Sequence, residues 1–94
     1  MTVYRAEASP TKRGTIEAIL RALQAPEWAA PNLDALADVL RDLSWLPQGP
    51  AELHWQVSSA LPSDTKSAIT DVLSTAQRQT AAGPRPFRLT TTVQ

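Results

Sequence analysis

The strongest constraint on the fold is the order in which two kinds of side-chain spacing follow one another along the chain. Residues 51–57 place an apolar side chain at every second position, which is the period of a β-strand with one buried face. Residues 87–93 show the same period, and residues 2–7 include the strand-forming side chains Val3 and Tyr4. We therefore predict strands at these three places.

Helical spacing fills the first interval between the predicted strands. In residues 15–24 the apolar side chains follow the i, i+3, i+4, i+7 stripe of an amphipathic helix, and Pro26 ends it. A second helix follows Asn32, whose side chain suits an N-cap. It ends by Leu46, because residues 47–50 hold two prolines and a glycine.

A third helix is predicted between the second and third strands. Ser63 is its predicted N-cap, an apolar stripe covers residues 68–76, and the Gly83-Pro84 pair stops it. Residues 58–61 could add a single helical turn. Because helical connections between strands favour parallel pairing, we predict an α/β fold, a three-stranded parallel sheet with three to four helices in two layers. The chain has 94 residues, the size of one domain, so residues 1–94 are predicted to form a single domain.

Composition and charge exclude several classes of protein. The sequence has no cysteine, so disulfides and thiolate metal sites are excluded, and a small domain without disulfides indicates a reducing compartment. Residues 1–10 show no signal-peptide pattern, and no apolar run approaches the roughly 18 residues of a membrane span. A cytoplasmic protein is therefore predicted. Nine basic and nine acidic side chains balance, which removes the charge expected of a nucleic-acid binder.

The sequence offers little catalytic chemistry. His54 is the single histidine and falls inside a predicted strand, where an edge or surface position is a more frequent explanation than a general base. One histidine without cysteine argues against transition-metal sites, and the three glycines lie too far apart to cradle a phosphate. We therefore predict a protein that is not an enzyme and that has no cofactor and no metal site.

Two features of residues 26–40 need more than a simple structural explanation. Trp28 sits in a proline-bounded linker, where it is either tucked under the loop or offered to a partner, as interface tryptophans are. Asp34 and Asp38 lie one helical turn apart on the face opposite the leucines, where like charges repel by roughly 0.2–0.5 kcal/mol. Such a pair is commonly solvated surface, but it could also imitate an anionic ligand by accepting charge-assisted hydrogen bonds from arginine.

The stretch PEWAAPNLDALADVL, residues 26–40, resembles a segment of barstar-type ribonuclease inhibitors. In that family proline, acid and aromatic lead into an Asn-Leu-Asp-Ala-Leu helix with a second aspartate after it. Leu53-His54-Trp55 is similar to the family's central strand, and the resemblance extends over residues 3–93. It implies a protein inhibitor of a secreted bacterial guanyl-specific ribonuclease, which blocks the enzyme's active site with the loop and helix of residues 26–45.

The resemblance also implies roles for individual residues. Asp38 would stand in for the substrate phosphate, with Asp34 beside it, and Trp28 would lie at the rim. The inhibitor would form a one-to-one complex with an extracellular-type microbial ribonuclease, and it would be a monomer when free, without nucleic-acid or membrane partners. The expected partner-binding residues are Trp28, Ala29, Ala30, Asn32, Leu33, Asp34, Ala37, Asp38 and Trp45.

Several positions depart from the best-known member of the family. Ala29, Ala30 and Pro31 stand where that member has an aromatic, a glycine and an acid. Ala37 replaces an aromatic, and Thr75 stands at the place of an acid on the last long helix. An alternative function is an immunity or adaptor protein that binds a non-ribonuclease toxin or a regulatory partner through the same acidic helix face.

Overall fold

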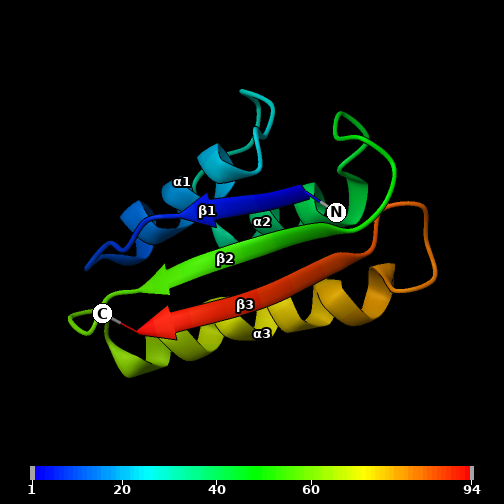
Figure 1. Cartoon of the computed structure of the whole chain (residues 1–94). Coiled ribbons are helices and arrows are strands. Elements are labelled where there is room, and N and C mark those ends of the chain that lie inside the picture. The colour runs from blue at the N-terminus through cyan, green and yellow to red at the C-terminus, as the bar shows by residue number, and fades with distance from the viewer. Residues whose placement is uncertain (1, 94) are drawn as a thin grey trace.

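The computed structural model describes residues 2–93 and confirms the predicted parallel sheet. Its three strands are β1 (Thr2–Ala6), β2 (Ala51–Val57) and β3 (Phe87–Val93), and β2 lies in the centre (Figure 1). β2 is parallel to both neighbours, so that Leu53 is paired with Tyr4 on one side and with Leu89 on the other. The second and third strands have the predicted bounds, and β1 ends one residue earlier than predicted.

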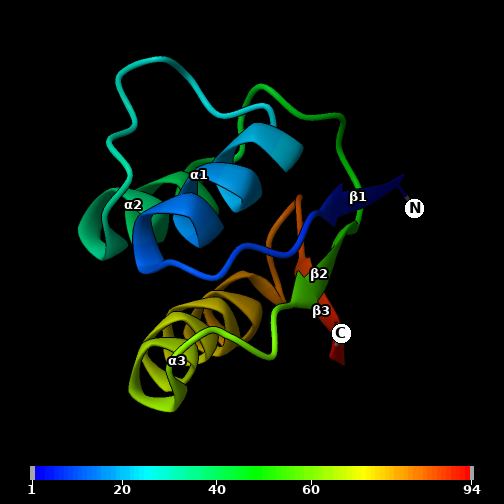
Figure 2. The ribbon, with the colours of Figure 1, turned by 90° about the vertical axis from the view of Figure 1, so that its left-hand side faces the viewer.

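Within residues 2–93, three helices cover one face of the sheet and leave the other face open (Figure 2). They are α1 (Lys12–Ala22), α2 (Leu33–Asp42) and α3 (Ser63–Thr80). This is the predicted two-layered α/β fold. Residues 58–61 do not add a further helix. They form a turn, in which the Leu61 amide donates to the Ser58 carbonyl oxygen at 3.1 Å.

The core lies between the helices and the covered face of the sheet. Along β2 the odd-numbered side chains are buried and the even-numbered ones half-buried, in the sense that the alternation predicts. Trp55 is 1% exposed and is the largest of the fully buried side chains. Burial of a large apolar side chain contributes about 1.5–3 kcal/mol. The apolar side chains on the inner faces of the helices therefore provide much of the stability of the fold. The fully buried aliphatic side chains of the helices and their ends are Ile16, Ile19, Leu23, Leu36, Val39, Leu40, Leu43, Ile69 and Leu73.

His54 belongs to the open face of the sheet. It alternates with the buried side chains of β2 and is half-buried, with its Nε2 at 3.3 Å from Oγ1 of Thr92 on β3. Its strand is central, so His54 is not an edge residue, and its place on the uncovered face matches the surface interpretation. No group of three or more His, Cys, Asp or Glu side chains that could hold a metal ion occurs in the described part of the chain.

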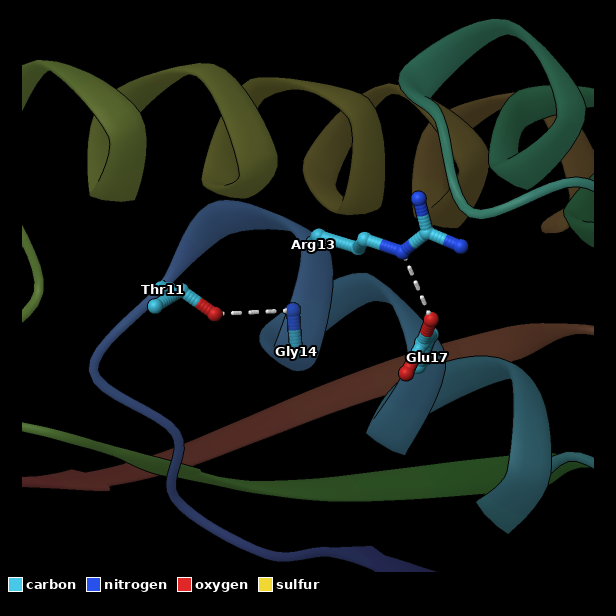
Figure 3. Close-up of polar contacts among 4 residues, drawn as sticks. All are labelled: Thr11, Arg13, Gly14 and Glu17. Carbon is cyan, nitrogen blue, oxygen red and sulfur yellow. Dashed lines mark hydrogen bonds and ion pairs between the residues drawn. The ribbon is translucent and has the colours of Figure 1, made fainter.

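α1 begins three residues earlier than the apolar stripe predicts. Thr11 is the N-cap, and its Oγ1 accepts from the Gly14 amide at 3.0 Å (Figure 3). In the same turn, Nε of Arg13 lies 3.0 Å from Oε1 of Glu17 in an exposed ion pair. The stripe does not reveal this turn because its side chains face solvent.

α1 and α2 both end before the prolines that follow them. α1 ends at Ala22, and Gln24 then takes a left-handed φ of 57°. α2 ends at Asp42, and Leu43 takes a φ of 47°. A left-handed residue just after the last turn is a common helix stop, usually with glycine in that place. These two residues, rather than Pro26 and the prolines of residues 47–50, therefore terminate the helices.

The prediction that Ser63 caps α3 is wrong. Ser63 is the first residue of the helix, and Pro62 takes the cap position with φ −56° and ψ 142°. The fixed φ of proline and its extended ψ set the chain at the helix start one residue before the serine. Pro62 offers no side-chain acceptor, whereas Asp64 accepts from the Thr65 amide at 2.8 Å and suits the positive end of the helix.

Candidate partner-binding surface

The connection between α1 and α2 arches away from the sheet (Figure 2). The Pro26 carbonyl oxygen accepts from the Ala29 amide at 3.0 Å, which closes a turn with Glu27 and Trp28 at its tip. Trp28 is 62% exposed. Of the two placements that the sequence left open for this tryptophan, the structure shows the one that offers it to solvent.

Asn32 begins α2 in the predicted way. Its Oδ1 accepts from the Ala35 amide at 2.8 Å, which satisfies one of the free amides of the first turn. Its own amide donates to the Ala30 carbonyl oxygen at 2.8 Å, so the exposed Ala30 is fixed through its backbone. Ala29 and Leu33 are half-buried and pack against the core. These contacts hold the loop and the helix in one fixed arrangement.

The solvent face of α2 carries the predicted carboxylates. Leu36, Val39 and Leu40 are buried beneath the helix, whereas Asp34 and Asp38 are exposed. Asp34 lies in the first turn, where the positive end of the helix dipole stabilises a carboxylate. Asp38 lies too far along the helix to gain from this effect.

Asp38 has a partner of its own in Arg41, which donates from Nη2 to Asp38 Oδ1. Arg41 is also in the last turn of α2, where a cation is favoured by the negative end of the helix dipole. The Asp38 side chain is 58% exposed and that of Arg41 53%, so water competes for the ion pair. Arg41 was not among the predicted site residues, although its i, i+3 spacing from Asp38 in the sequence indicates an ion pair on the helix surface.

A groove of about 190 Å³ lies beside this face, between α2 and α3. Ala37 and Arg41 line it from α2, and Asp71 and Thr75 line it from α3. Ala37 is half-buried there and forms a small apolar wall. Thr75 Oγ1 accepts from Nη2 of Arg78 on its own helix at 3.2 Å. Asp71, which also lines this groove, was not among the predicted site residues.

Trp45 lies at the far end of the segment. Its Nε1 donates to the Leu23 carbonyl oxygen at 2.9 Å, and this bond ties the chain after α2 to the end of α1. The side chain is half-buried and packs against the core. Trp45 therefore has a supporting role in the structure, and its contact with a partner stays a prediction.

The expected partner-binding residues differ in accessibility but share one surface segment. The half-buried ones are Ala29, Leu33, Ala37 and Trp45. Of these, Ala29, Leu33 and Trp45 pack against the core, and Ala37 lines the groove between α2 and α3. The exposed ones are Trp28, Ala30, Asn32, Asp34 and Asp38.

A family model described as Barstar (barnase inhibitor) matches residues 2–92. The chain belongs to the barstar family. Barstar-family proteins are intracellular, non-enzymatic inhibitors that bind barnase-type ribonucleases, so membership implies a barnase-like ribonuclease inhibitor. The prediction that the chain is not an enzyme is thereby confirmed. No curated protein gives a significant match to this chain.

Over residues 2–93, no helix of this barstar-family chain is both long enough and apolar enough to cross a bilayer.

Proposed function

We propose that this barstar-family chain is a single-domain cytoplasmic inhibitor of a secreted bacterial guanyl-specific ribonuclease, and that residues 26–45 block the active site of the enzyme. The observation that carries the proposal is the outward placement of Asp34 and Asp38 on α2, after a loop with an exposed Trp28. Family membership supports the class of the target.

Asp38 takes the place of the substrate phosphate in this proposal. A ribonuclease must hold a phosphodiester, so its active site presents cationic side chains. A carboxylate accepts from a guanidinium the same charge-assisted and often bidentate hydrogen bonds that a phosphate accepts. Asp38 is near the middle of the exposed face of α2, and Asp34 is one turn nearer the loop, where it meets a neighbouring cation of the enzyme.

Residues 26–45 are already held in place in the free inhibitor, and this favours a tight complex. The Asn32 cap, the turn at Ala29 and the hydrogen bond from Trp45 to Leu23 attach the segment to the core. A surface that is already ordered loses less conformational entropy on association. The exposed indole of Trp28 then covers apolar surface at the rim and excludes water from the ion pairs.

The complex contains one inhibitor and one ribonuclease, and the free inhibitor is a monomer. We expect the complex to bury roughly 1,600 Å² of surface, the standard size for enzyme–inhibitor pairs. Binding requires no cofactor and no nucleic acid, because the carboxylates of α2 replace the phosphate of the substrate.

The test is the titration of a panel of guanyl-specific microbial ribonucleases, both acidic and basic, with the wild-type chain and Asp38→Ala. We expect one enzyme to lose all activity at equimolar inhibitor. Asp38→Ala should weaken that inhibition at least tenfold, or by about 1.4 kcal/mol. Glu52→Gln is the matched control, since it removes one negative charge from the open face of the sheet, and it should change inhibition by less than about twofold.

A guanosine monophosphate should compete with the inhibitor, because both need the phosphate-binding groups of the enzyme. Equal inhibition by wild type and Asp38→Ala would exclude Asp38 as the phosphate substitute. If no enzyme of the panel is inhibited, the proposal is wrong, and an immunity or adaptor protein with a non-ribonuclease partner becomes the better hypothesis.

A further inference from the structure

We infer that Arg41 is an exchangeable counter-ion of Asp38. It pairs with Asp38 in the free inhibitor and turns into the α2–α3 groove, toward Asp71, when the ribonuclease binds Asp38. The inference rests on the proposed function, because it explains how Asp38 becomes available to the enzyme.

The ion pair within α2 conflicts with the role proposed for Asp38. Nη2 of Arg41 donates to Asp38 Oδ1 in the free chain. The ribonuclease must bring its own cations to the same carboxylate. If Arg41 stayed in place, its guanidinium would lie beside those cations, and like charges at contact distance repel. Binding is therefore more favourable when Arg41 leaves.

The ion pair between Asp38 and Arg41 is weak enough for a cation of the enzyme to replace Arg41. Its two side chains are 58% and 53% exposed, so water and salt screen their attraction. Arg41 also keeps its favourable place at the C-terminal end of α2 in either position, because the helix dipole does not depend on Asp38. A change of side-chain rotamer therefore suffices, and the backbone of α2 stays where it is.

The groove between α2 and α3 offers the guanidinium a second carboxylate. Arg41 and Asp71 line the same groove of about 190 Å³. Its walls include the small side chains of Ala37 and Ala76, which leave room for a long arginine side chain. In this position the positive charge of Arg41 faces Asp71, and it no longer neutralises Asp38.

The exchange also selects among partners. An isolated cation gains little by displacing Arg41, since it replaces one ion pair with another. A site that presents several cations to Asp38 and Asp34 gains more, because its additional hydrogen bonds have no equivalent in the free chain. Arg41 therefore lowers the affinity for surfaces with a single cation more than the affinity for a phosphate-binding site.

The first experiment addresses the free chain and needs no ribonuclease. We would measure ¹⁵N relaxation of the arginine Nε–H groups in the wild-type chain and in Asp38→Asn. We expect Arg41 to become more mobile in the variant, whereas Arg13, which pairs with Glu17 on α1, stays the same (Figure 3). Equal mobility of Arg41 in the two proteins would overturn the inference, whatever the target enzyme.

The second experiment measures inhibition of the ribonuclease that the wild-type chain titrates in the panel. Arg41→Gln should tighten inhibition about two- to fivefold at low salt, the range that one exposed ion pair allows. Arg88→Gln is the matched control, because it removes the same charge from the open face of the sheet, and its effect should stay below about twofold. Weaker inhibition by Arg41→Gln would show that Arg41 itself contacts the enzyme, and would overturn the inference.

A double-mutant cycle tests Asp71 as the second partner of Arg41. Asp71→Asn should weaken inhibition about twofold in the wild-type chain and have no effect beside Arg41→Gln, because Asp71 acts only through Arg41. Equal weakening in both backgrounds would mean that Asp71 contacts the enzyme directly. If Asp38→Ala inhibits as well as wild type, Asp38 is not the phosphate substitute, and the part of the proposed function on which the exchange rests fails. If Asp38 is essential and Arg41→Gln does not tighten inhibition, only the exchange fails.

Discussion

The indole Nε1 of Trp45 donates a hydrogen bond to the carbonyl oxygen of Leu23, at a distance of 2.9 Å and across 22 residues of sequence. The bond joins the chain after α2 to the C-cap of α1. It therefore closes the unit of loop and helix that carries Trp28, Asp34 and Asp38. The sequence has no cysteine, so noncovalent contacts such as this one hold the segment in place.

Removal of this hydrogen bond should destabilise the fold. Trp45→Phe keeps an aromatic ring but removes the N–H donor, and we expect the free energy of unfolding to fall by about 0.5–1.5 kcal/mol in urea denaturation. Trp28→Phe is the control, because that indole is exposed, and it should change stability by less than about 0.5 kcal/mol. Equal stability of the two variants would show that the Trp45 bond contributes nothing.

Gln24→Gly should stabilise the protein, because Gln24 lies just after α1 in a backbone conformation that favours glycine. Gln24 has a φ of 57°, a left-handed conformation that costs a non-glycine residue roughly 1–2 kcal/mol. The side chain is exposed, so its removal loses no core packing. After the larger chain entropy of glycine in the unfolded state is subtracted, a gain of about 0.5–1 kcal/mol is expected in urea denaturation. Gln24→Ala keeps the unfavourable φ, and a similar gain for that variant would contradict the explanation.

The periodic parts of the fold were predictable from the sequence, and the ends of the helices were not. The alternation around Trp55 indicates a strand with one buried face, and the structure has the strand with the predicted bounds. Helix ends follow from local backbone geometry instead. Gln24 and Leu43 take left-handed conformations that their residue types do not predict. Pro62, rather than Ser63, occupies the N-cap position of α3.

The candidate site, too, was predictable from the sequence only in part. The spacing of Asp34 and Asp38 against the leucines predicts that both carboxylates face solvent, and both do. The ion pair between Asp38 and Arg41 was also predictable, from their i, i+3 spacing. Asp71 was not, because the groove that it lines with Arg41 exists only where α3 packs beside α2. Contacts between elements far apart in the sequence depend on tertiary packing, which a residue pattern does not specify.

Thr80 should be important for the attachment of β3 to the end of α3. Its Oγ1 donates to the Ala76 carbonyl oxygen and accepts from the Phe87 amide, both at 2.8 Å. Thr80→Val removes both bonds and leaves the amide of a buried residue unpaired, so the free energy of unfolding should fall by about 1–3 kcal/mol. Thr80→Ser keeps the hydroxyl and should lose less. Thermal unfolding of the two variants checks this, and a valine variant as stable as the serine variant would count against the bridge.

Substitution of Trp28 should weaken binding to the ribonuclease without changing the stability of the fold. Its side chain is 62% exposed, so Trp28→Ala should change the free energy of unfolding by less than about 0.5 kcal/mol. If the turn of residues 26–29 lies at the rim of the complex, the same variant should inhibit the target ribonuclease at least about tenfold more weakly, since exposed tryptophans that become buried at interfaces are frequent hot spots. Val93→Ala is the matched control, because Val93 is 66% exposed but lies on β3, and it should alter neither property. A stable Trp28→Ala variant with full inhibitory strength would exclude the loop tip from the interface and leave the carboxylates of α2 to account for binding.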